Sequence, residues 1–92
     1  MLEKKNFYIN GEWVSSKNQK DIEVINPANS KSCAVISLGS NEDINDAVNA
    51  AKKAFATWGY SKKEERLALL EKFYELYKKR WNDITEAIML EM

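Results

Sequence analysis

The chain has 92 residues, enough for one domain at most. Its hydrophobic content of 45% and aromatic content of 11% are those of a globular protein rather than a disordered tail. Fourteen basic residues balance fourteen acidic ones, so no overall field attracts nucleic acid or an anionic membrane.

The residue types that are missing or rare exclude several kinds of site. The sequence has no histidine, and Cys33 is its only cysteine. An intrachain disulfide is therefore excluded, and neither a zinc site nor a Cys-His pair is credible. Residues 1–6 lack the apolar core of a signal peptide, and no stretch approaches the roughly 20 apolar residues of a membrane span. We therefore expect a cytoplasmic protein.

A tight β-hairpin is predicted over residues 7–14. Phe7, Ile9, Gly11 and Trp13 alternate with the residues between them, which is the period of a half-buried strand. Asn10-Gly11 in the middle indicates a type I′ turn, because both residues tolerate the positive φ that this turn requires. Residues 15–20 are polar and typical of a loop.

Two further strands are predicted over residues 22–25 and 33–38. The first is rich in β-branched residues and ends at Asn26-Pro27, because proline lacks the backbone donor that a ladder needs. Residues 28–31 have turn chemistry. A strand, a short polar turn and a strand predict an antiparallel pair, after which Gly39 interrupts the pattern.

The sequence after Gly39 is helical in pattern. Ser40 is expected to cap a first helix, and the acidic side chains of Glu42 and Asp43 suit the positive end of its dipole. Gly59 is a natural stop for this helix. Its apolar residues step by four and three along one face, namely Ile44, Val48, Ala51, Phe55 and Trp58.

A capping box at Ser61-Lys62-Lys63-Glu64 is expected to open a second helix. Glu75 lies four residues before Lys79, which predicts an exposed ion pair worth about 0.3 kcal/mol. The helical pattern still continues at Met92 without a C-cap signal, which favours a trimmed chain end or an interrupted reading frame over a native terminus. The apolar stripe comprises Leu67, Leu70, Tyr74, Tyr77, Trp81, Ile84 and Ile88, widened by Phe73 and Leu76.

These elements occur in a recognisable order. The segments YINGEWV (8–14), IEVINPANSK (22–31) and AVNAAKKAFATW (47–58) are followed by ERLALLEKFYELYKKRWNDITEAIMLEM (65–92). The ordered set resembles the N-terminal segment of the NAD(P)-dependent aldehyde dehydrogenase superfamily. The resemblance implies an incomplete α+β fold: a hairpin and antiparallel strands within residues 1–39, then two or three amphipathic helices within 40–92. It also implies that residues 1–92 are a single segment of the cofactor-binding half.

In that family a cysteine thiolate attacks the aldehyde, hydride passes to the nicotinamide, and a glutamate activates water. The resemblance places these groups downstream of residue 92, so we assign no catalytic or cofactor-binding residue to this chain. Cys33 does not replace the nucleophile, because it lies on a predicted strand with no base beside it. No Gly-x-Gly-x-x-Gly loop occurs either. The three tryptophans, Trp13, Trp58 and Trp81, are interpreted as packing anchors.

One binding feature of the family can be transferred to particular residues. Some members hold a monovalent cation with backbone carbonyls near the equivalents of Val24 and Ile25 and an acidic residue matching Glu91. Oxygen ligands suit such a hard cation, but the site also needs groups beyond this chain. Otherwise we expect no metal site.

Two functions stay open at this point. The first is an N-terminal aldehyde dehydrogenase fragment, inactive alone, whose partner is the remainder of the enzyme and whose parent uses NAD or NADP. The second is a small helical interaction module from a truncated gene that self-associates, because exposed apolar stripes recruit partners. Neither binds nucleic acid or a membrane. These residues do not determine the aldehyde substrate or the choice between NAD and NADP.

Overall fold

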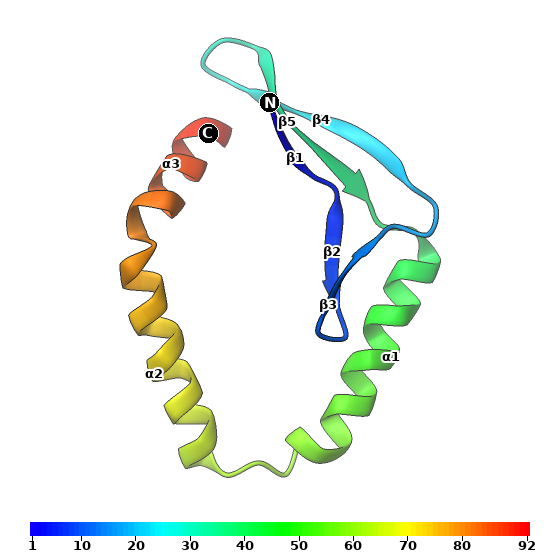
Figure 1. The fold of residues 1–92 in the computed structure, drawn as a ribbon, viewed down its shortest axis with the longest axis vertical. Coiled ribbons are helices and arrows are strands. Elements are labelled where there is room, and N and C mark those ends of the chain that lie inside the picture. Colours follow the sequence, from blue (N-terminus) through cyan, green and yellow to red (C-terminus); the bar gives the residue numbers. More distant parts are fainter.

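The chain divides into a strand-rich first part and a helical second part (Figure 1). The computed structural model describes all residues from 1 to 92. This order of strands and helices confirms the predicted α+β fold. The elements are β1 (Leu2–Lys4), β2 (Asn6–Ile9), β3 (Glu12–Ser15), β4 (Lys20–Asn26), β5 (Lys31–Leu38), α1 (Asn41–Trp58), α2 (Lys63–Lys79) and α3 (Trp81–Glu91).

The predicted hairpin is confirmed as the antiparallel pair β2–β3. Asn10 and Gly11 connect the strands with φ values of 55° and 78°, as a turn with two left-handed residues requires. Tyr8 lies directly opposite Trp13, and their ring centroids are 5.2 Å apart. This cross-strand aromatic pair stabilises the hairpin, but Trp13 stays 71% exposed, so it does not anchor packing within the chain.

A second, three-stranded sheet has the order β1-β5-β4. The antiparallel pairing of β4 with β5 is confirmed, and its register shifts between Val24 and Ile25. The prediction of antiparallel strands alone was incomplete, because β1 pairs with β5 in parallel, with Leu2 opposite Ala34. Residues 2–4 carry no strand signal of their own, and they are held as a strand by hydrogen bonding to a segment about thirty residues later.

Asp43 joins the strand-rich part to α1. Its carboxylate accepts hydrogen bonds from the Ser16 hydroxyl at 2.6 Å and from the Lys17 backbone N–H at 3.0 Å. The Ser40 N–H and hydroxyl both donate to it at 2.9 Å, which completes the predicted cap of α1 as a capping box. Asp43 is only 5% exposed, and its four donors come from two separate segments. We call this arrangement the Asp43 junction.

A second polar cluster lies at the end of the three-stranded sheet. The Ser37 hydroxyl donates to Asp21 at 2.8 Å, and the Lys5 ammonium lies 2.9 Å from the same carboxylate. Hydrogen bonds from Lys5, Ser37 and Gln19 lower the pKa of Asp21 to about 2. Ser37 and Asp43 are the two buried residues of the chain, and both are polar.

The small residues of α1 lie toward the hairpin. A shallow pocket between β2 and α1 is lined by four alanines, and their small side chains allow the hairpin to approach the helix. Ile44 also borders the hairpin, beside Phe7 and Ile9, whereas Phe55 is 70% exposed. The predicted stripe is therefore helical but unburied, and Trp58 is also exposed within this chain. The four alanines are Ala47, Ala50, Ala51 and Ala54.

The second predicted helix is divided at Arg80 into α2 and α3. Arg80 has φ −105° and ψ 15°, outside the helical region, and its side chain reaches Asp83 at 3.3 Å. The apolar stripe predicted over residues 67–88 therefore changes direction at this residue. Trp81, the first residue of α3, is 58% exposed and packs edge-to-face on Tyr77 with centroids 5.6 Å apart.

Two local predictions in this region were wrong. Ser61 does not cap α2, because the helix begins at Lys63 and its N-cap is Lys62, which makes no capping hydrogen bond. The Ser61 hydroxyl oxygen instead accepts from the Arg66 guanidinium at 3.3 Å. Glu75 pairs with Lys78 at 2.9 Å rather than with Lys79. The Lys78 ammonium also lies 4.7 Å from the centre of the Tyr74 ring, so it has two favourable contacts at this position.

The elements form an open arrangement rather than a layered core. α1 leads away from the sheet, and α2 and α3 return along the other side until α3 contacts β4 (Figure 1). The radius of gyration is 16.9 Å, against about 12 Å for a compact chain of this length. No apolar side chain is buried. None of the three helices combines the length and the apolar character that crossing a membrane requires.

The turn of the hairpin gives a first testable prediction. Gly11→Ala places a Cβ at φ 78°, which costs about 1 kcal/mol and lowers the folded-to-open ratio of the hairpin roughly fivefold. The near-ultraviolet circular dichroism of the Tyr8–Trp13 pair measures this ratio. Gly39→Ala is the matched control, because its Cβ enters open space without a left-handed φ. An unchanged signal in Gly11→Ala would contradict the assigned turn.

The Asp43 junction gives a prediction about pH. Hydrogen bonds from Ser16, Ser40 and Lys17 hold the pKa of Asp43 well below its ordinary value of 3.8. The stabilisation is therefore fully present above about pH 4 and is lost as the pH falls below it. We expect the helical population of residues 41–46, read from backbone carbon chemical shifts, to fall between pH 4 and pH 2. Asp43→Asn should lower this population at pH 6 and flatten its pH dependence, and an equally steep profile would refute the assignment.

Candidate functional site

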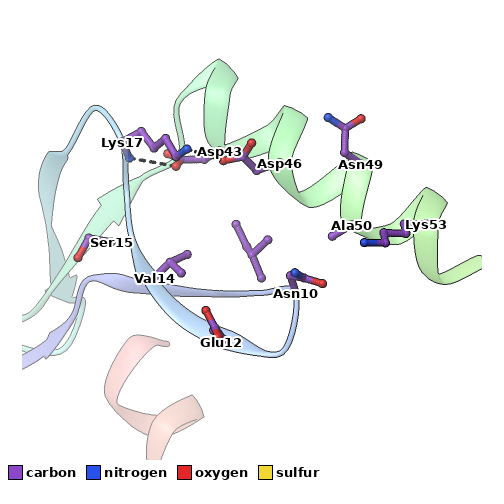
Figure 2. Close-up of a pocket in the computed structure, with 11 residues that line it drawn as sticks. Asn10, Glu12, Val14, Ser15, Lys17, Asp43, Asp46, Asn49, Ala50 and Lys53 are labelled. Carbon is purple, nitrogen blue, oxygen red and sulfur yellow. Dashed lines mark hydrogen bonds and ion pairs between the residues drawn. The ribbon is translucent and has the colours of Figure 1, made fainter.

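A concave region lies between the hairpin and α1 (Figure 2). It has a volume of about 440 Å³ and runs from Lys17 and Asp43 at one end to Asn10 and Lys53 at the other. Its walls are mostly polar, and the Lys17 ammonium pairs with Asp46 at 3.1 Å. The remaining lining residues are Ile9, Glu12, Val14, Ser15, Asn49 and Ala50.

A hydroxyl–carboxylate pair, Ser16 and Asp43, lies beside this pocket and has a structural role. The Ser16 hydroxyl oxygen lies 2.6 Å from a carboxylate oxygen of Asp43, a distance that a nucleophile and its base would also show. However, the Asp43 carboxylate accepts four hydrogen bonds and has a lowered pKa, so it is a weak base. The chain has no histidine that could take the proton instead. The pair therefore holds the loop after β3 against α1.

The N-terminus of α1 is not open to the phosphate of a dinucleotide. One common phosphate site consists of free N–H groups at a helix N-terminus, usually after a glycine-rich loop. At the start of α1 the Ser40 N–H is already occupied by Asp43, and the carboxylate would repel a phosphate. The three glycines, Gly11, Gly39 and Gly59, lie at separate turns and element ends.

Cys33 lies within β5 and is half-buried. Its thiol donates to the Val24 carbonyl at 3.3 Å, across the antiparallel pair. No basic group or helix N-terminus adjoins it that would favour a thiolate. The predicted strand position of Cys33 is confirmed.

The three residues named for a monovalent cation lie on two elements. Val24 and Ile25 flank the register shift in β4, where the ladder is irregular. Glu91 is the last residue of α3, the helix that contacts β4. The Val24 carbonyl already accepts the Cys33 thiol, and no group of three or more acidic or cysteine side chains gathers here. The cation site stays a prediction.

Sequence reasoning missed most of the Asp43 junction. The Ser40–Asp43 capping box has a sequence signal and was expected in part. Ser16, Lys17 and Asp46 had none, because they lie in or opposite a polar loop whose partner is 26–29 residues away. No sequence signal that we used indicates that the loop after β3 lies against the start of α1.

Comparison with known proteins gives consistent results. The model of the aldehyde dehydrogenase family matches residues 13–92. A 3-succinoylsemialdehyde-pyridine dehydrogenase from a Pseudomonas species is 41% identical over 92 residues, which is all of this chain and 19% of that protein. The crystal structure of an aldehyde dehydrogenase from Bartonella henselae matches with a TM-score of 0.98 and 49% identity.

The extent of these matches defines the part of the enzyme that is present. The Bartonella henselae structure covers 100% of this chain, while this chain covers 19% of it. The alignments fall at the start of the relatives, so the chain corresponds to about their N-terminal fifth. With a family match over 80 of its residues and a nearly superimposable fold, the chain belongs to the aldehyde dehydrogenase family.

Proposed function

We propose that this chain is a structural segment of an NAD(P)-dependent aldehyde dehydrogenase and is inactive by itself. The whole enzyme would oxidise an aldehyde to a carboxylic acid, and residues beyond this segment would carry the nucleophile and the base. The most direct support is that the whole chain superimposes on about a fifth of a related aldehyde dehydrogenase. In addition, the chain buries no apolar side chain of its own. A segment of that kind has its core partners elsewhere.

NAD or NADP would bind to the remainder of the enzyme and accept a hydride from the substrate. This chain would contribute by position: the Asp43 junction fixes α1 against the hairpin, and α1 in turn fixes where the chain enters α2. We also propose a cytoplasmic location, which the single unpaired Cys33 supports, since a reducing compartment keeps such a thiol free. Val24, Ile25 and Glu91 are retained as proposed contacts for a monovalent cation in the whole enzyme.

A second candidate is a stand-alone interaction module that self-associates. The observation in its favour is the number of exposed large apolar side chains, which include Phe55, Phe73 and Trp81. Apolar surface of this extent is unusual for a soluble monomer and marks an interface. Light scattering distinguishes the two candidates, because a monomeric free chain at high concentration would speak against the module.

The inactivity of the chain gives a direct prediction. Purified free of host enzymes, the 92-residue chain should produce no aldehyde-dependent NADH or NADPH, because it holds no nucleophile beside a base. A hybrid that carries this chain in place of the N-terminal fifth of the Bartonella henselae enzyme should be active. Absorbance at 340 nm with a panel of aldehydes measures both. Activity in the free chain, or a soluble but inactive hybrid, would contradict the proposal.

A further inference from the structure

α2 presents an unusual amount of apolar surface. Seven large apolar side chains lie on this helix, and each is between 37% and 65% exposed. The main contacts of α2 within the chain are with α3, its own continuation. The seven residues are Leu67, Leu69, Leu70, Phe73, Tyr74, Leu76 and Tyr77.

These side chains form two adjacent facets. At 100° per residue, Leu67, Leu70, Tyr74 and Tyr77 project along one direction, which we call facet A. Leu69, Phe73 and Leu76 project about 110° from it, which we call facet B. Together they span about 180° of the helix, whereas a helix lying on one surface needs a stripe of about 100°. The opposite side carries Ala68 and seven charged residues: Glu64, Glu65, Glu71, Lys72, Glu75, Lys78 and Lys79. Two charged residues of the first turn, Lys63 and Arg66, project within the apolar arc.

Facet B also adjoins a hollow. The helix breaks at Arg80, and a concave region of about 540 Å³ lies at this break, beside Phe73 and Leu76. Tyr77, Arg80 and Ile84 complete its lining, so four of its five residues are apolar. A hollow of this composition accommodates large apolar side chains of another polypeptide.

The exposed area decides what kind of partner fits. The accessible surface is 8086 Å², whereas a compact protein of 10.6 kDa exposes about 5,500 Å². The surplus of about 2,600 Å² far exceeds the roughly 800 Å² that each partner buries in a standard interface. In a symmetric contact with a second copy, both copies use the same patch, and a standard interface of this kind would leave most of the surplus of the chain exposed. A larger partner that covers both facets fits the exposed area better.

We propose that facets A and B of α2 are the docking surface for the remaining four fifths of an aldehyde dehydrogenase polypeptide, which this chain binds even when the two are separate molecules. This inference rests on the proposed function. The partner is identified from the length of the relatives. This chain spans only 18–19% of them, and the rest of such a polypeptide is what would cover α2. The charged side of α2 would stay in contact with solvent.

Coexpression with a defined partner tests this proposal. The partner is the Bartonella henselae aldehyde dehydrogenase without the region aligned to this chain, and the 92-residue chain carries an affinity tag. We expect the two pieces to copurify in equal amounts. Leu70→Glu with Tyr74→Glu in facet A, or Phe73→Glu with Leu76→Glu in facet B, should each lower the recovered partner at least tenfold, because the new charges would be buried without counter-ions.

The matched control carries the same change of charge on the opposite side. Lys72→Gln with Lys79→Gln also makes the chain more negative by two charges, and it should leave recovery within twofold. Leu70→Gln with Tyr74→Gln adds no charge and keeps a good helix former at each position, so a loss of recovery here reports lost contact. All four positions substituted in the facets are exposed in the free chain, and its circular dichroism should not change.

The outcomes separate this proposal from the proposed function. Equal recovery with facet and control variants would overturn the docking surface, as would a chain that dimerises through α2 and leaves the partner unbound. A complex that depends on both facets supports the surface whether or not it is active. If that complex produces no NADH from any aldehyde, the docking surface stands and the proposed function fails.

Discussion

The carboxylate of Asp43 is the contact on which the arrangement of this chain depends. It accepts donors from Ser16 and Lys17 after the hairpin and from Ser40 before α1, so one side chain fixes two segments that are 23 or more residues apart. In a globular domain such segments would be positioned by a shared apolar core. Here no apolar side chain is buried, and polar hydrogen bonding sets the direction in which α1 leaves the sheet.

This distribution of polar and apolar contacts has a consequence for α2 and α3. Hydrogen bonds to Asp43 and Asp21 are satisfied within the chain, whereas the large apolar residues of α1, α2 and α3 are not buried in it. Apolar burial is the dominant favourable term in folding, so most of the stabilisation available to these residues is realised only in a larger assembly. The helices keep their positions through Arg80 and the contact of α3 with β4.

The elements that the sequence predicted are those with local causes. Asn10-Gly11 specifies its own turn, Pro27 ends its own strand, and Ser40 with Asp43 caps its own helix, so each could be recognised from a few neighbouring residues. β1 had no such signal, because its strand conformation comes from β5. Ser61 has the sequence pattern of a capping box, but the N-cap position of α2 falls one residue later, at Lys62. The junction around Asp43 required knowledge of which distant loop returns to α1.

The burial of the apolar stripes could not be predicted for a different reason. The periodicity of Ile44, Val48 and Phe55 identifies a face that needs covering, but it does not say which polypeptide covers it. In this chain the alanine face of α1 lies on the hairpin, and the larger residues are left exposed. The same reasoning applies to α2, where the two facets together span a wider arc than the stripe of a helix that lies on one flat surface. Amphipathic periodicity therefore specifies the orientation of a helix only when the residues that complete the apolar core are present. This chain corresponds to a fifth of an aldehyde dehydrogenase, so it contains the helices but not those residues.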